Sequence, residues 1–417
     1  MQPTPLETRS PAERAAALAL ALPAQVQAAM AVPAMAARLQ GVDAAAVTSL
    51  AALARLPVTR KHELLDAQNA QRGSDAFGGY SALGWASQRA LRPARRVYQS
   101  PGPLYEPEGA GTDYWRAARA MHAAGFMAGD LVHNSFSYHL TPGAWIMESG
   151  AHALGCTVFP GGVGNTELQL QALQHLRPAA YAGTPSFLRI LLEKAAETGL
   201  ALPSLKKALV SGEAFPPSLR DWLLARGVAA YQAYATADVG VIAFETTARD
   251  GLVVDEGVLV EIVRPGTRDV LPAGEVGEVV VTTFNADYPM LRFGTGDLSA
   301  VLPGPCPTGR TGPRIKGWLG RADQTAKVRG MFVHPGQVAE LLKRHPELAR
   351  VRLVVAGEMA NDQPTLQAET QGMPEGLQAA VAASVRDITK LRCEVQLLPP
   401  GSLPNDGKLI EDRRSYT

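Results

Sequence analysis

Four short stretches of the sequence contain residue types that could take part in catalysis. They read "YATAD" (234–238), "FGTGD" (293–297), "GRADQTAKVRG" (320–330) and "LPNDGKL" (403–409). Carboxylates accept hydrogen bonds from hydroxyl groups or bind hard cations such as Mg²⁺, and a lysine ammonium can neutralise negative charge that develops during a reaction. Each stretch alone also has an ordinary reading, because Asp after Gly is typical of a turn and a Lys near the C-terminus is typical of a solvated tail.

A fifth stretch, "YQSPGPLYEPEG" (98–109), is rich in Pro and Gly and lies between two Ala-rich regions. Loops of this composition often hold the phosphates of a nucleotide. This one contains no lysine, and its two glutamates, Glu106 and Glu108, would repel phosphate. Pro101 and Pro103 also lack the backbone N–H groups that could bind phosphate oxygens. We therefore expect a loop with poor phosphate-binding chemistry.

The pattern of elements predicts where these residues lie. Helical stretches alternate with short apolar runs from about residue 115 to 245, which predicts parallel βαβ units with ligands at the strand ends. Residues 251–301 are β-rich and predict an antiparallel or barrel-like subdomain. A smaller α+β unit of about 95 residues follows Gly320. At the N-terminus, Ser10 is a candidate N-cap for a helix.

Composition limits the class of protein. The chain has 417 residues, of which 46% are hydrophobic and 19% charged, and its net charge is +1. These values are typical of a globular protein of two or three domains, and they favour neither a nucleic-acid partner nor a membrane surface. No signal peptide or membrane span is expected at the N-terminus. The three cysteines lie far apart (Cys156, Cys306 and Cys393), as in a cytoplasmic protein with reduced thiols.

The order and spacing of the motifs resemble those of the adenylate-forming acyl-CoA synthetase superfamily, most closely its phenylacetate-CoA ligase-like branch. The resemblance covers nearly the whole chain. The matching segments are "SLAALARLPVTRKHELLDAQ" (49–68), residues 124–162, "RPAAYAGTPSFL" (177–188), "KKALVSGEAFPPSLRDWL" (206–223), and the signature "YPMLRFGTGDLSAVLP" followed by "GWLGRADQTAKVRGMFVHPGQVAELL".

The resemblance implies a fold and a reaction. The fold would be a large α/β AMP-binding domain, residues 1–319, with a β-rich subdomain at about 251–301, followed by a small mobile α+β domain, residues 320–417. In the reaction, a carboxylic acid attacks the α-phosphate of ATP and releases pyrophosphate. The thiol of CoA then attacks the acyl-adenylate. Catalysis of this kind depends on positioning and on stabilisation of negative charge.

The resemblance also implies roles for residues in the second half of the chain. Asp297 would bind the ribose hydroxyls and Arg321 would face the nucleotide. Asp323 corresponds to the hinge about which the small domain turns, and Gly330 to the loop near CoA. Lys408 would neutralise charge on the substrate carboxylate and the α-phosphate during adenylation.

Further roles fall on the central motifs. Tyr234 would flank the adenine, with Ala235 and Thr236 beside it, and Asp238 replaces the usual Glu near Mg²⁺. Thr236 lies one position early for the customary hydroxyl residue and is a candidate substitute for it. The "VSGEAF" stretch would place Gly212 and Glu213 near the adenine, and the open alternative for Glu213 is a surface helix N-terminus.

The acyl pocket would include Phe136, Tyr138 and His139, although aromatic residues fit a protein core equally well. In the 98–109 stretch, Ser100 and Gly102 match the family's phosphate loop. Three interpretations remain open for this stretch. Pyrophosphate is held by Mg²⁺ and by basic residues elsewhere, the loop orders only on ATP binding, or adenylation has been lost.

The sequence thus predicts an AMP-forming ligase that joins an aryl or related hydrophobic carboxylic acid to CoA. ATP, Mg²⁺ and CoA are the implied cofactors and cosubstrates, and a cytoplasmic homodimer is expected from the resemblance. The alternative is a homologue that binds a nucleotide or acyl-CoA and has lost adenylation.

Overall fold

The structure is a computed structural model that describes residues 2–88, 92–319, 321–322, 326–329, 331–333, 335–358, 361–372, 374–404 and 408–414. The chain divides into two compact units, residues 1–319 and 320–417. Each unit buries its own hydrophobic clusters. Among the described helices, none is both long and apolar enough to cross a bilayer.

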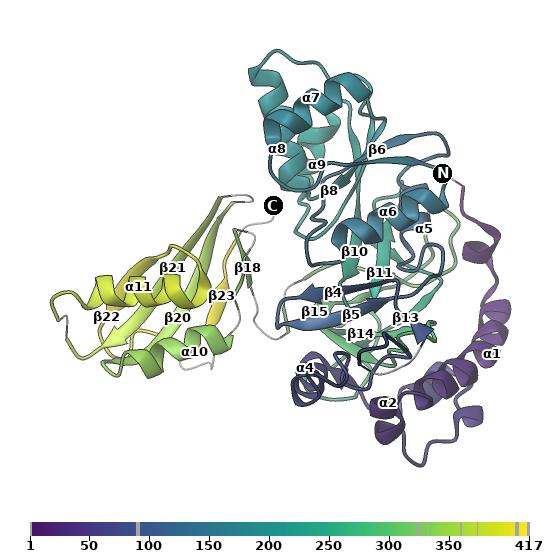
Figure 1. The fold of residues 1–417 in the computed structure, drawn as a ribbon, viewed down its shortest axis with the longest axis horizontal. Helices are drawn as coiled ribbons and strands as arrows, with labels where there is room; N and C mark the ends of the chain where they lie inside the picture. Colours follow the sequence, from purple (N-terminus) through teal and green to yellow (C-terminus); the bar gives the residue numbers. More distant parts are fainter. Residues whose placement is uncertain are drawn as a thin grey trace. The chain divides into compact units, whose positions relative to one another are not determined.

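A nine-stranded sheet forms the centre of the large unit, with strand order β16-β17-β12-β11-β10-β9-β8-β6-β7 (Figure 1). The run from β10 to β7 is parallel, and the remaining pairs are antiparallel. The strands are β6 (Leu131–Asn134), β7 (Thr157–Pro160), β8 (Ala180–Gly183), β9 (Lys207–Val210), β10 (Ala229–Thr236), β11 (Gly240–Glu245), β12 (Leu252–Val254), β16 (Val301–Leu302) and β17 (Arg314–Ile315).

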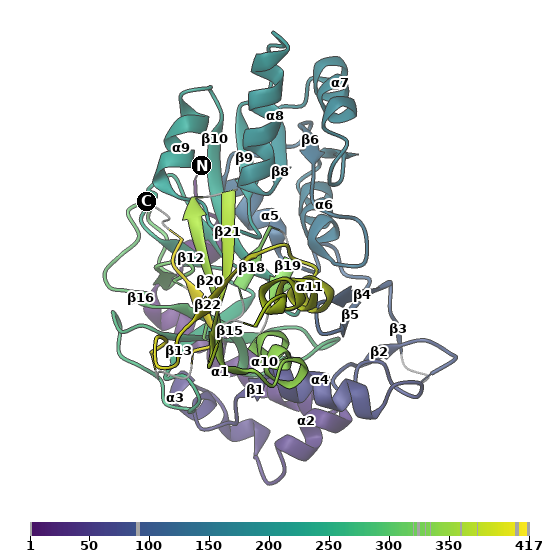
Figure 2. The ribbon, with the colours of Figure 1, turned by 90° about the vertical axis from the view of Figure 1, so that its left-hand side faces the viewer.

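Helices connect the parallel strands, as the alternating pattern of the sequence predicts. They are α6 (Gly143–Ala153), α7 (Thr166–Leu176), α8 (Pro185–Glu197) and α9 (Pro217–Leu224), and α5 (Ala117–Ala123) precedes the first of these strands, β6. Buried apolar residues of α5 and α6 share one hydrophobic cluster with residues of the sheet, while α8 contacts β8 and α9 contacts β10. Figure 2 shows α7 and α8 side by side near β8 and β9. The α/β fold class is therefore confirmed.

The large unit also contains a four-stranded sheet, of order β1-β15-β14-β13. It contains β1 (Thr59–Arg60), β13 (Val258–Val263), β14 (Gly277–Thr283) and β15 (Phe293–Ser299). Residues 251–301 are β-rich, and β13, β14 and β15 pair antiparallel, as predicted, but the strands of this region divide between two sheets. Strands β12 and β16, from the same region, belong to the nine-stranded sheet. An apolar run identifies a strand, but its partner is set by packing far along the chain.

The expected loop over 98–109 is also wrong. Strands β4 (Arg96–Ser100) and β5 (Leu104–Glu108) pair as an antiparallel hairpin, and only residues 101–103 join them. Two hydrogen bonds between buried side chains stabilise the hairpin: the Ser100 hydroxyl donates to Glu106 and the Tyr98 hydroxyl donates to Glu108. Two of the three prolines lie in the turn, where a missing N–H does not disturb the ladder.

The N-terminal segment lies against the large unit. It contains η1 (Pro5–Thr8), α1 (Pro11–Met30), α2 (Pro33–Arg38), η2 (Ala44–Ala46), α3 (Leu50–Leu53) and α4 (Lys61–Ala70), and a short pair of strands follows, β2 (Leu83–Gly84) and β3 (Arg92–Pro93). Ser10 caps α1 as predicted, because its hydroxyl accepts from the N–H of Glu13 at 3.2 Å. Arg9 and Arg14 both pair with the buried Glu256, and Glu7 pairs with the buried Arg310.

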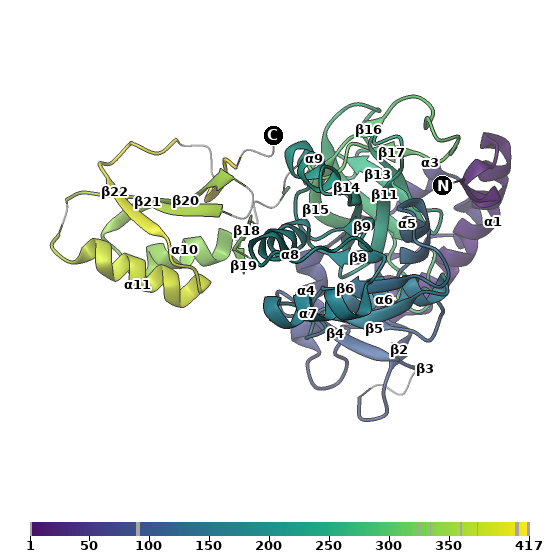
Figure 3. The same ribbon diagram turned by 90° about the horizontal axis from the view of Figure 1, so that it is seen from above.

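The small unit is a four-stranded sheet with two helices on one face (Figures 1 and 3). The sheet order is β22-β21-β20-β23, and β18 and β19 form a separate pair. The elements are β18 (Ala326–Val328), β19 (Met331–Val333), α10 (Pro335–Arg344), β20 (Leu348–Glu358), β21 (Asn361–Thr370), α11 (Leu377–Thr389), β22 (Glu394–Leu398) and β23 (Ile410–Asp412).

Candidate active site

Two residues predicted to bind the nucleoside lie in direct contact. Tyr234 is on β10 and Asp297 is on β15, and both are buried. The Tyr234 hydroxyl donates to Asp297 Oδ2 at 2.8 Å. The indole N–H of Trp318 donates to the other oxygen, Asp297 Oδ1, at 3.1 Å. The carboxylate is therefore held in one orientation from both sides before any ligand arrives.

Asp238 lies in the turn that joins β10 to β11. A β-bulge after Tyr234 and the φ of +72° at Gly240 shape this turn. Ala235 and Thr236 end β10, and the Thr236 hydroxyl accepts from the N–H of Val239 at 3.3 Å. The predicted role of Thr236 as a hydroxyl donor to the nucleotide stays a prediction.

The Asp238 carboxylate is buried, and its two oxygens differ. Oδ2 accepts from Lys61 Nζ at 3.1 Å. Oδ1 is buried and has no hydrogen-bond partner among the described residues. A buried carboxylate oxygen in this state fits the hard cation Mg²⁺, which often binds one or two protein carboxylates and keeps several waters. The described residues contain no group of three or more His, Cys, Asp or Glu that could hold a metal ion.

Glu106 lies near Asp238, although the sequence indicated only that it would repel phosphate. It is fully buried on β5, where it accepts a hydrogen bond from the Ser100 hydroxyl. Burial raises the pKa of Glu106 to about 8, and the negative charge of Asp238 adds to the increase. The hydroxyl of Ser100, a predicted phosphate ligand, is thus engaged inside the hairpin, and Gly102 lies in the turn beside it.

Helix α4 fixes the spacing of this cluster. Its first residue, Lys61, contacts Asp238. Near its other end, Gln68 exchanges two hydrogen bonds with the backbone of Tyr105, with distances of 2.8 and 2.9 Å. The helix follows directly after β1, which pairs with β15, the strand of Asp297. Helix α4 therefore contacts Asp238 directly, contacts the strand of Glu106 through Tyr105, and follows the strand that pairs with β15.

Gly212 and Glu213 follow β9, at the carboxyl end of the parallel sheet. Gly212 has a φ of +84°, a conformation that favours glycine. Glu213 is half-buried, and its carboxylate accepts from the N–H of Ser186 at 2.7 Å, in the first turn of α8. Glu213 therefore caps a different helix from the one that follows it, and its predicted contact with adenine stays a prediction.

The predicted acyl-pocket residues follow β6. The Tyr138 hydroxyl donates to Glu148 at 2.7 Å and accepts from Asn134 at 2.9 Å. The Tyr138 ring packs edge-on against Trp145, with centroids 5.1 Å apart. Phe136 is half-buried and His139 is exposed. Phe136 and Tyr138 therefore lie at the edge of the core, whereas His139 lies on the surface of the large unit.

The remaining predicted residues belong to the small unit. Lys408 is exposed just before β23, and its backbone carbonyl accepts from Arg352 at 3.2 Å. Arg321 is half-buried. Asp323 and Gly330, the predicted hinge and CoA residues, lie outside the described residues.

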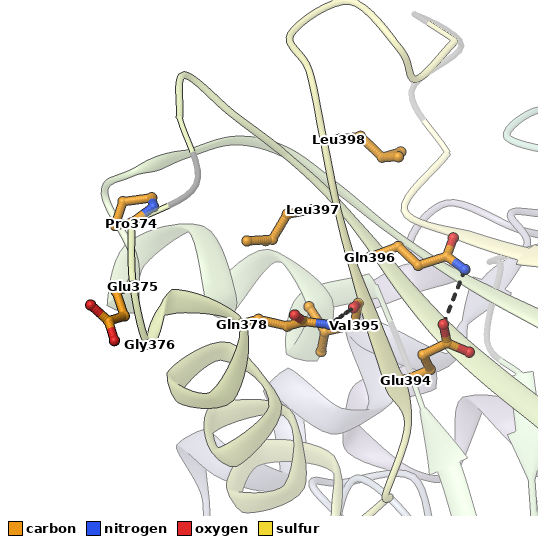
Figure 4. Close-up of a pocket in the computed structure, with 9 residues that line it drawn as sticks. All are labelled: Pro374, Glu375, Gly376, Gln378, Glu394, Val395, Gln396, Leu397 and Leu398. Carbon is orange, nitrogen blue, oxygen red and sulfur yellow. Dashed lines mark hydrogen bonds between the residues drawn. The ribbon is translucent and has the colours of Figure 1, made fainter.

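A hollow of about 570 Å³ opens between β22 and the start of α11 in the small unit (Figure 4). Its floor includes the hydrogen bond from Gln378 to the carbonyl of Val395 at 2.7 Å. Glu375 and Glu394 line it, and its lining contains no Lys or Arg among the described residues. An anionic nucleotide or CoA would find no cation in this lining, and none of the predicted site residues contributes to it.

Sequence reasoning missed three residues of the site. Trp318 precedes the "GRAD" motif and gave no signal of its own. Lys61 lies in the segment 49–68, which was matched only as a whole. The sequence drew attention to Glu106 only through its charge. Its burial could be recognised only from a predicted hairpin, because alternate residues of a strand face the same side.

Comparison with known proteins assigns the family. The AMP-binding enzyme family matches residues 116–285. A phenylacetate-coenzyme A ligase of Aromatoleum evansii is 33% identical over 74% of this chain and 70% of its own length. One from Thermus thermophilus is 30% identical over 88% of both chains. The chain belongs to the phenylacetate-CoA ligase family. The predicted membership of the adenylate-forming superfamily is confirmed, and the chain is an AMP-forming carboxylate–CoA ligase.

Solved structures agree with the assignment. A 2-hydroxyisobutyryl-CoA ligase in complex with 2-HIB-AMP and CoA is 26% identical, with a TM-score of 0.81 over 99% of this chain and 92% of that one. A structure of an open conformation of that ligase has a TM-score of 0.69 at the same identity, over 97% of this chain and 93% of that one. The adenylate-forming synthetase fold is therefore confirmed for this ligase.

Proposed function

We propose that this ligase activates an aryl or related hydrophobic carboxylic acid. The carboxylate of the acid attacks the α-phosphorus of ATP and pyrophosphate leaves. The thiol sulfur of CoA then attacks the acyl carbon and AMP leaves. Support for an aryl substrate comes from the aromatic side chains of Phe136, Tyr138 and Trp145 near the end of β6, and from the phenylacetate-CoA ligases to which the chain is similar.

The contact between Tyr234 and Asp297 carries the proposal. Tyr234 and Trp318 each donate a hydrogen bond to Asp297. A carboxylate can accept about four hydrogen bonds, so one that is held in this way can also accept from the vicinal hydroxyls of a ribose. Because the protein fixes the orientation of the carboxylate in advance, less entropy is lost when the nucleoside binds.

In this proposal the other residues surround the reacting phosphate. Asp238 holds Mg²⁺, which when bound neutralises charge on the phosphates. Lys408 places its ammonium near the substrate carboxylate and the α-phosphate, and Arg321 contacts the nucleotide. After adenylation, the small unit turns at Asp323. Lys408 then leaves the reacting phosphate, and the loop of Gly330 takes its place before CoA attacks.

A cytoplasmic homodimer completes the proposal. The free cysteines are consistent with a reducing compartment. Sedimentation of the purified protein at micromolar concentration tests the dimer, and a species with the mass of one chain would contradict it.

The test is pyrophosphate release, or hydroxamate formation, with a panel of acids. The panel contains phenylacetate, other aryl acids, straight-chain acids and 2-hydroxyisobutyrate. We expect aryl acids to give the highest kcat/KM. Preference for 2-hydroxyisobutyrate would overturn the aryl assignment. No turnover with any acid, together with measurable AMP or acyl-CoA binding, would favour a homologue that has lost adenylation.

A further inference from the structure

The glycine loop (residues 161–164, Gly-Gly-Val-Gly) follows β7 at the carboxyl end of the parallel sheet. Gly162 and Gly164 have φ of +67° and +75°, a backbone region that favours glycine. The side-chain amide of Gln169, a buried residue of α7, donates to the carbonyl of Gly162 at 2.9 Å and to that of Gly164 at 2.7 Å. Gln169 therefore fixes the path of the loop through its amide nitrogen.

The oxygen of the same amide, Gln169 Oε1, faces His133 on β6. The distance from Oε1 to His133 Nε2 is 2.6 Å, and both side chains are buried. Because an amide oxygen can only accept, the imidazole carries a proton on Nε2. Burial lowers the pKa of His133, although the hydrogen bond with Gln169 opposes this change. At neutral pH the ring is therefore uncharged, and its single N–H group is bonded to Gln169.

The two neighbouring strands hold the imidazole in place. The ring of His133 stacks on that of Tyr181 from β8, with centroids 6.2 Å apart. It also packs against the ring of Phe159 from β7, with centroids 5.3 Å apart. The Tyr181 hydroxyl accepts in turn from the Ser135 hydroxyl at 2.5 Å. Because these contacts restrict rotation of the imidazole, Gln169 is bonded to a donor in a fixed position.

The first residue of the glycine loop packs against this pair of side chains. A Cβ at Gly161 would lie 2.9 Å from His133 Nε2 and 3.0 Å from Gln169 Oε1. These separations are too short for van der Waals contact, so a side chain at this position would displace the two groups. The path of the loop and the hydrogen bond between His133 and Gln169 therefore depend on each other.

The glycine loop connects the pair to the predicted acyl pocket. The N–H of Gly162 donates to the backbone carbonyl of Asn134 at 3.0 Å. The side-chain amide of Asn134 donates to the Tyr138 hydroxyl at 2.9 Å, and this hydroxyl donates to Glu148 at 2.7 Å. A continuous series of contacts therefore leads from the buried His133 to Tyr138.

We propose that Gln169 and His133 are positioning residues that determine which acid the ligase prefers. They hold the glycine loop, and the loop holds Asn134 and the Tyr138 ring in one arrangement. Neither side chain has to touch the acid, because a displacement of about 1 Å that starts far from the reacting atoms can alter the rate strongly. The inference rests on the proposed function in taking Tyr138 as a residue of the acyl pocket.

The experiment measures kcat/KM of the full-length protein for benzoate, phenylacetate, 3-phenylpropionate and 2-hydroxyisobutyrate. Gln169→Met keeps the length of the side chain and removes its hydrogen bonds to His133, Gly162 and Gly164. Water can replace the lost amide at the two glycine carbonyls, because Gly162 is half-buried and Gly164 is exposed. Gln171→Met, at an exposed position of the same helix, is the matched control.

We expect Gln169→Met to change the ratio of kcat/KM between the two best acids of the wild type at least fivefold. The change should come mainly from KM for the acid, with KM for ATP altered less than twofold. Gln171→Met should leave the ratio within twofold of the wild type. A purely structural role would lower the Tm and the active fraction without changing the ratio, because both acids are measured on the same folded protein.

Gly161→Ala disturbs the same contacts and removes no hydrogen-bonding group. Its Cβ would press on His133 and Gln169, so this variant should also change the ratio, by at least threefold. Hydrogen exchange of the peptide that covers residues 161–164, followed by mass spectrometry, should be faster in Gln169→Met than in Gln171→Met, because the loop loses two hydrogen bonds.

An unchanged ratio in Gln169→Met would overturn the inference. If this variant does not fold, an unchanged ratio in Gly161→Ala has the same consequence. Failure of the proposed function gives a different result. Preference of the wild type for 2-hydroxyisobutyrate would overturn the aryl assignment, whereas a changed ratio in Gln169→Met would still support the inference. Absence of turnover with every acid would overturn both.

Discussion

The hydroxyl of Tyr234 donates a 2.8 Å hydrogen bond to the carboxylate of Asp297, across two strands that belong to different sheets. This bond joins the nine-stranded sheet to the four-stranded one at the place where the ribose is proposed to bind. The position of the nucleoside therefore depends on how the two sheets pack, and a substitution on either strand is expected to alter it.

Tyr234→Phe removes this hydrogen bond and keeps the ring. Hydrogen bonds to charged groups contribute about 1.5–3 kcal/mol, so we expect the affinity for AMP to fall by about tenfold or more. Isothermal titration calorimetry measures the effect. Tyr231→Phe, on the same strand, is the control and should leave the affinity unchanged.

Asp297→Asn tests the ribose contact itself. The wild type should discriminate strongly against 2′-deoxy-ATP in pyrophosphate release, and the variant should lose most of this discrimination because the asparagine keeps one acceptor oxygen without the charge. Equal discrimination in both proteins would remove Asp297 from the proposed site.

Lys408→Ala should abolish adenylation and spare the second half-reaction. Its ammonium is proposed to stabilise charge that develops only while the acid attacks ATP, and removal of such a group commonly costs about 10²–10³ in kcat. Pyrophosphate exchange and thioester formation from supplied acyl-adenylate measure the two steps. Lys390→Ala, an exposed lysine in the same unit, is the control. A parallel loss of both steps would contradict the assigned role.

Glu7→Gln should destabilise the large unit in a pH-dependent manner. Burial raises the pKa of Glu7, but hydrogen bonds from Thr4 and Arg310 and the charge of Arg310 outweigh it, so the net pKa is lowered. The ion pair therefore stabilises the fold above the ordinary pKa of a glutamate and loses its effect as the pH falls through the lowered value.

We expect Glu7→Gln to reduce the free energy of unfolding by about 3 kcal/mol at pH 7, because Arg310 stays buried without its partner. The difference from the wild type should shrink at pH 3.5. Urea unfolding at both pH values measures it. Glu13→Gln, which alters an exposed capping box, should cost less than about 1 kcal/mol. A loss that is the same at both pH values would contradict the ion-pair argument.

Gly183→Ala should destabilise the end of β8. A Cβ there would collide with Ser135 Oγ and with the hydroxyl oxygen of Tyr181. Overpacking of this kind costs about 1–3 kcal/mol, measured by thermal unfolding. Gly143→Ala is the control, because its Cβ would meet only Phe136, at 3.7 Å. Equal stability of the two variants would show that the Ser135 and Tyr181 hydroxyls move aside freely.

Much of the fold was predictable because the spacing of apolar residues along the chain differs between helices and strands. The alternation of apolar runs and helical stretches between 115 and 245 gave β6 to β10 and their helices. That β12 and β16 belong to the nine-stranded sheet could not be predicted, because an apolar run does not indicate which strands it pairs with. In the same way, Pro and Gly in "SPGP" are typical of both a loop and a tight hairpin turn.

Site residues could be predicted where they belong to a recognisable sequence motif. Contacts between residues outside such motifs could not be predicted, because they depend on the fold alone. Tyr234 and Asp297 were both named, and they touch. Lys61 and Asp238 touch across 177 positions, and no local pattern announces that contact. Glu106 was seen as a charge that repels phosphate, because its burial follows from the hairpin and from α4.

Side chains near the start of the chain form ion pairs with buried side chains far along the sequence of the large unit: Glu7 with Arg310, and Arg9 and Arg14 with Glu256. Loss of the first fifteen codons would remove Glu7, Arg9 and Arg14, and the buried Arg310 and Glu256 would lose these ion-pair partners. Recombinant versions of this enzyme should therefore keep those codons, and a purification tag is better joined upstream of them than substituted for them.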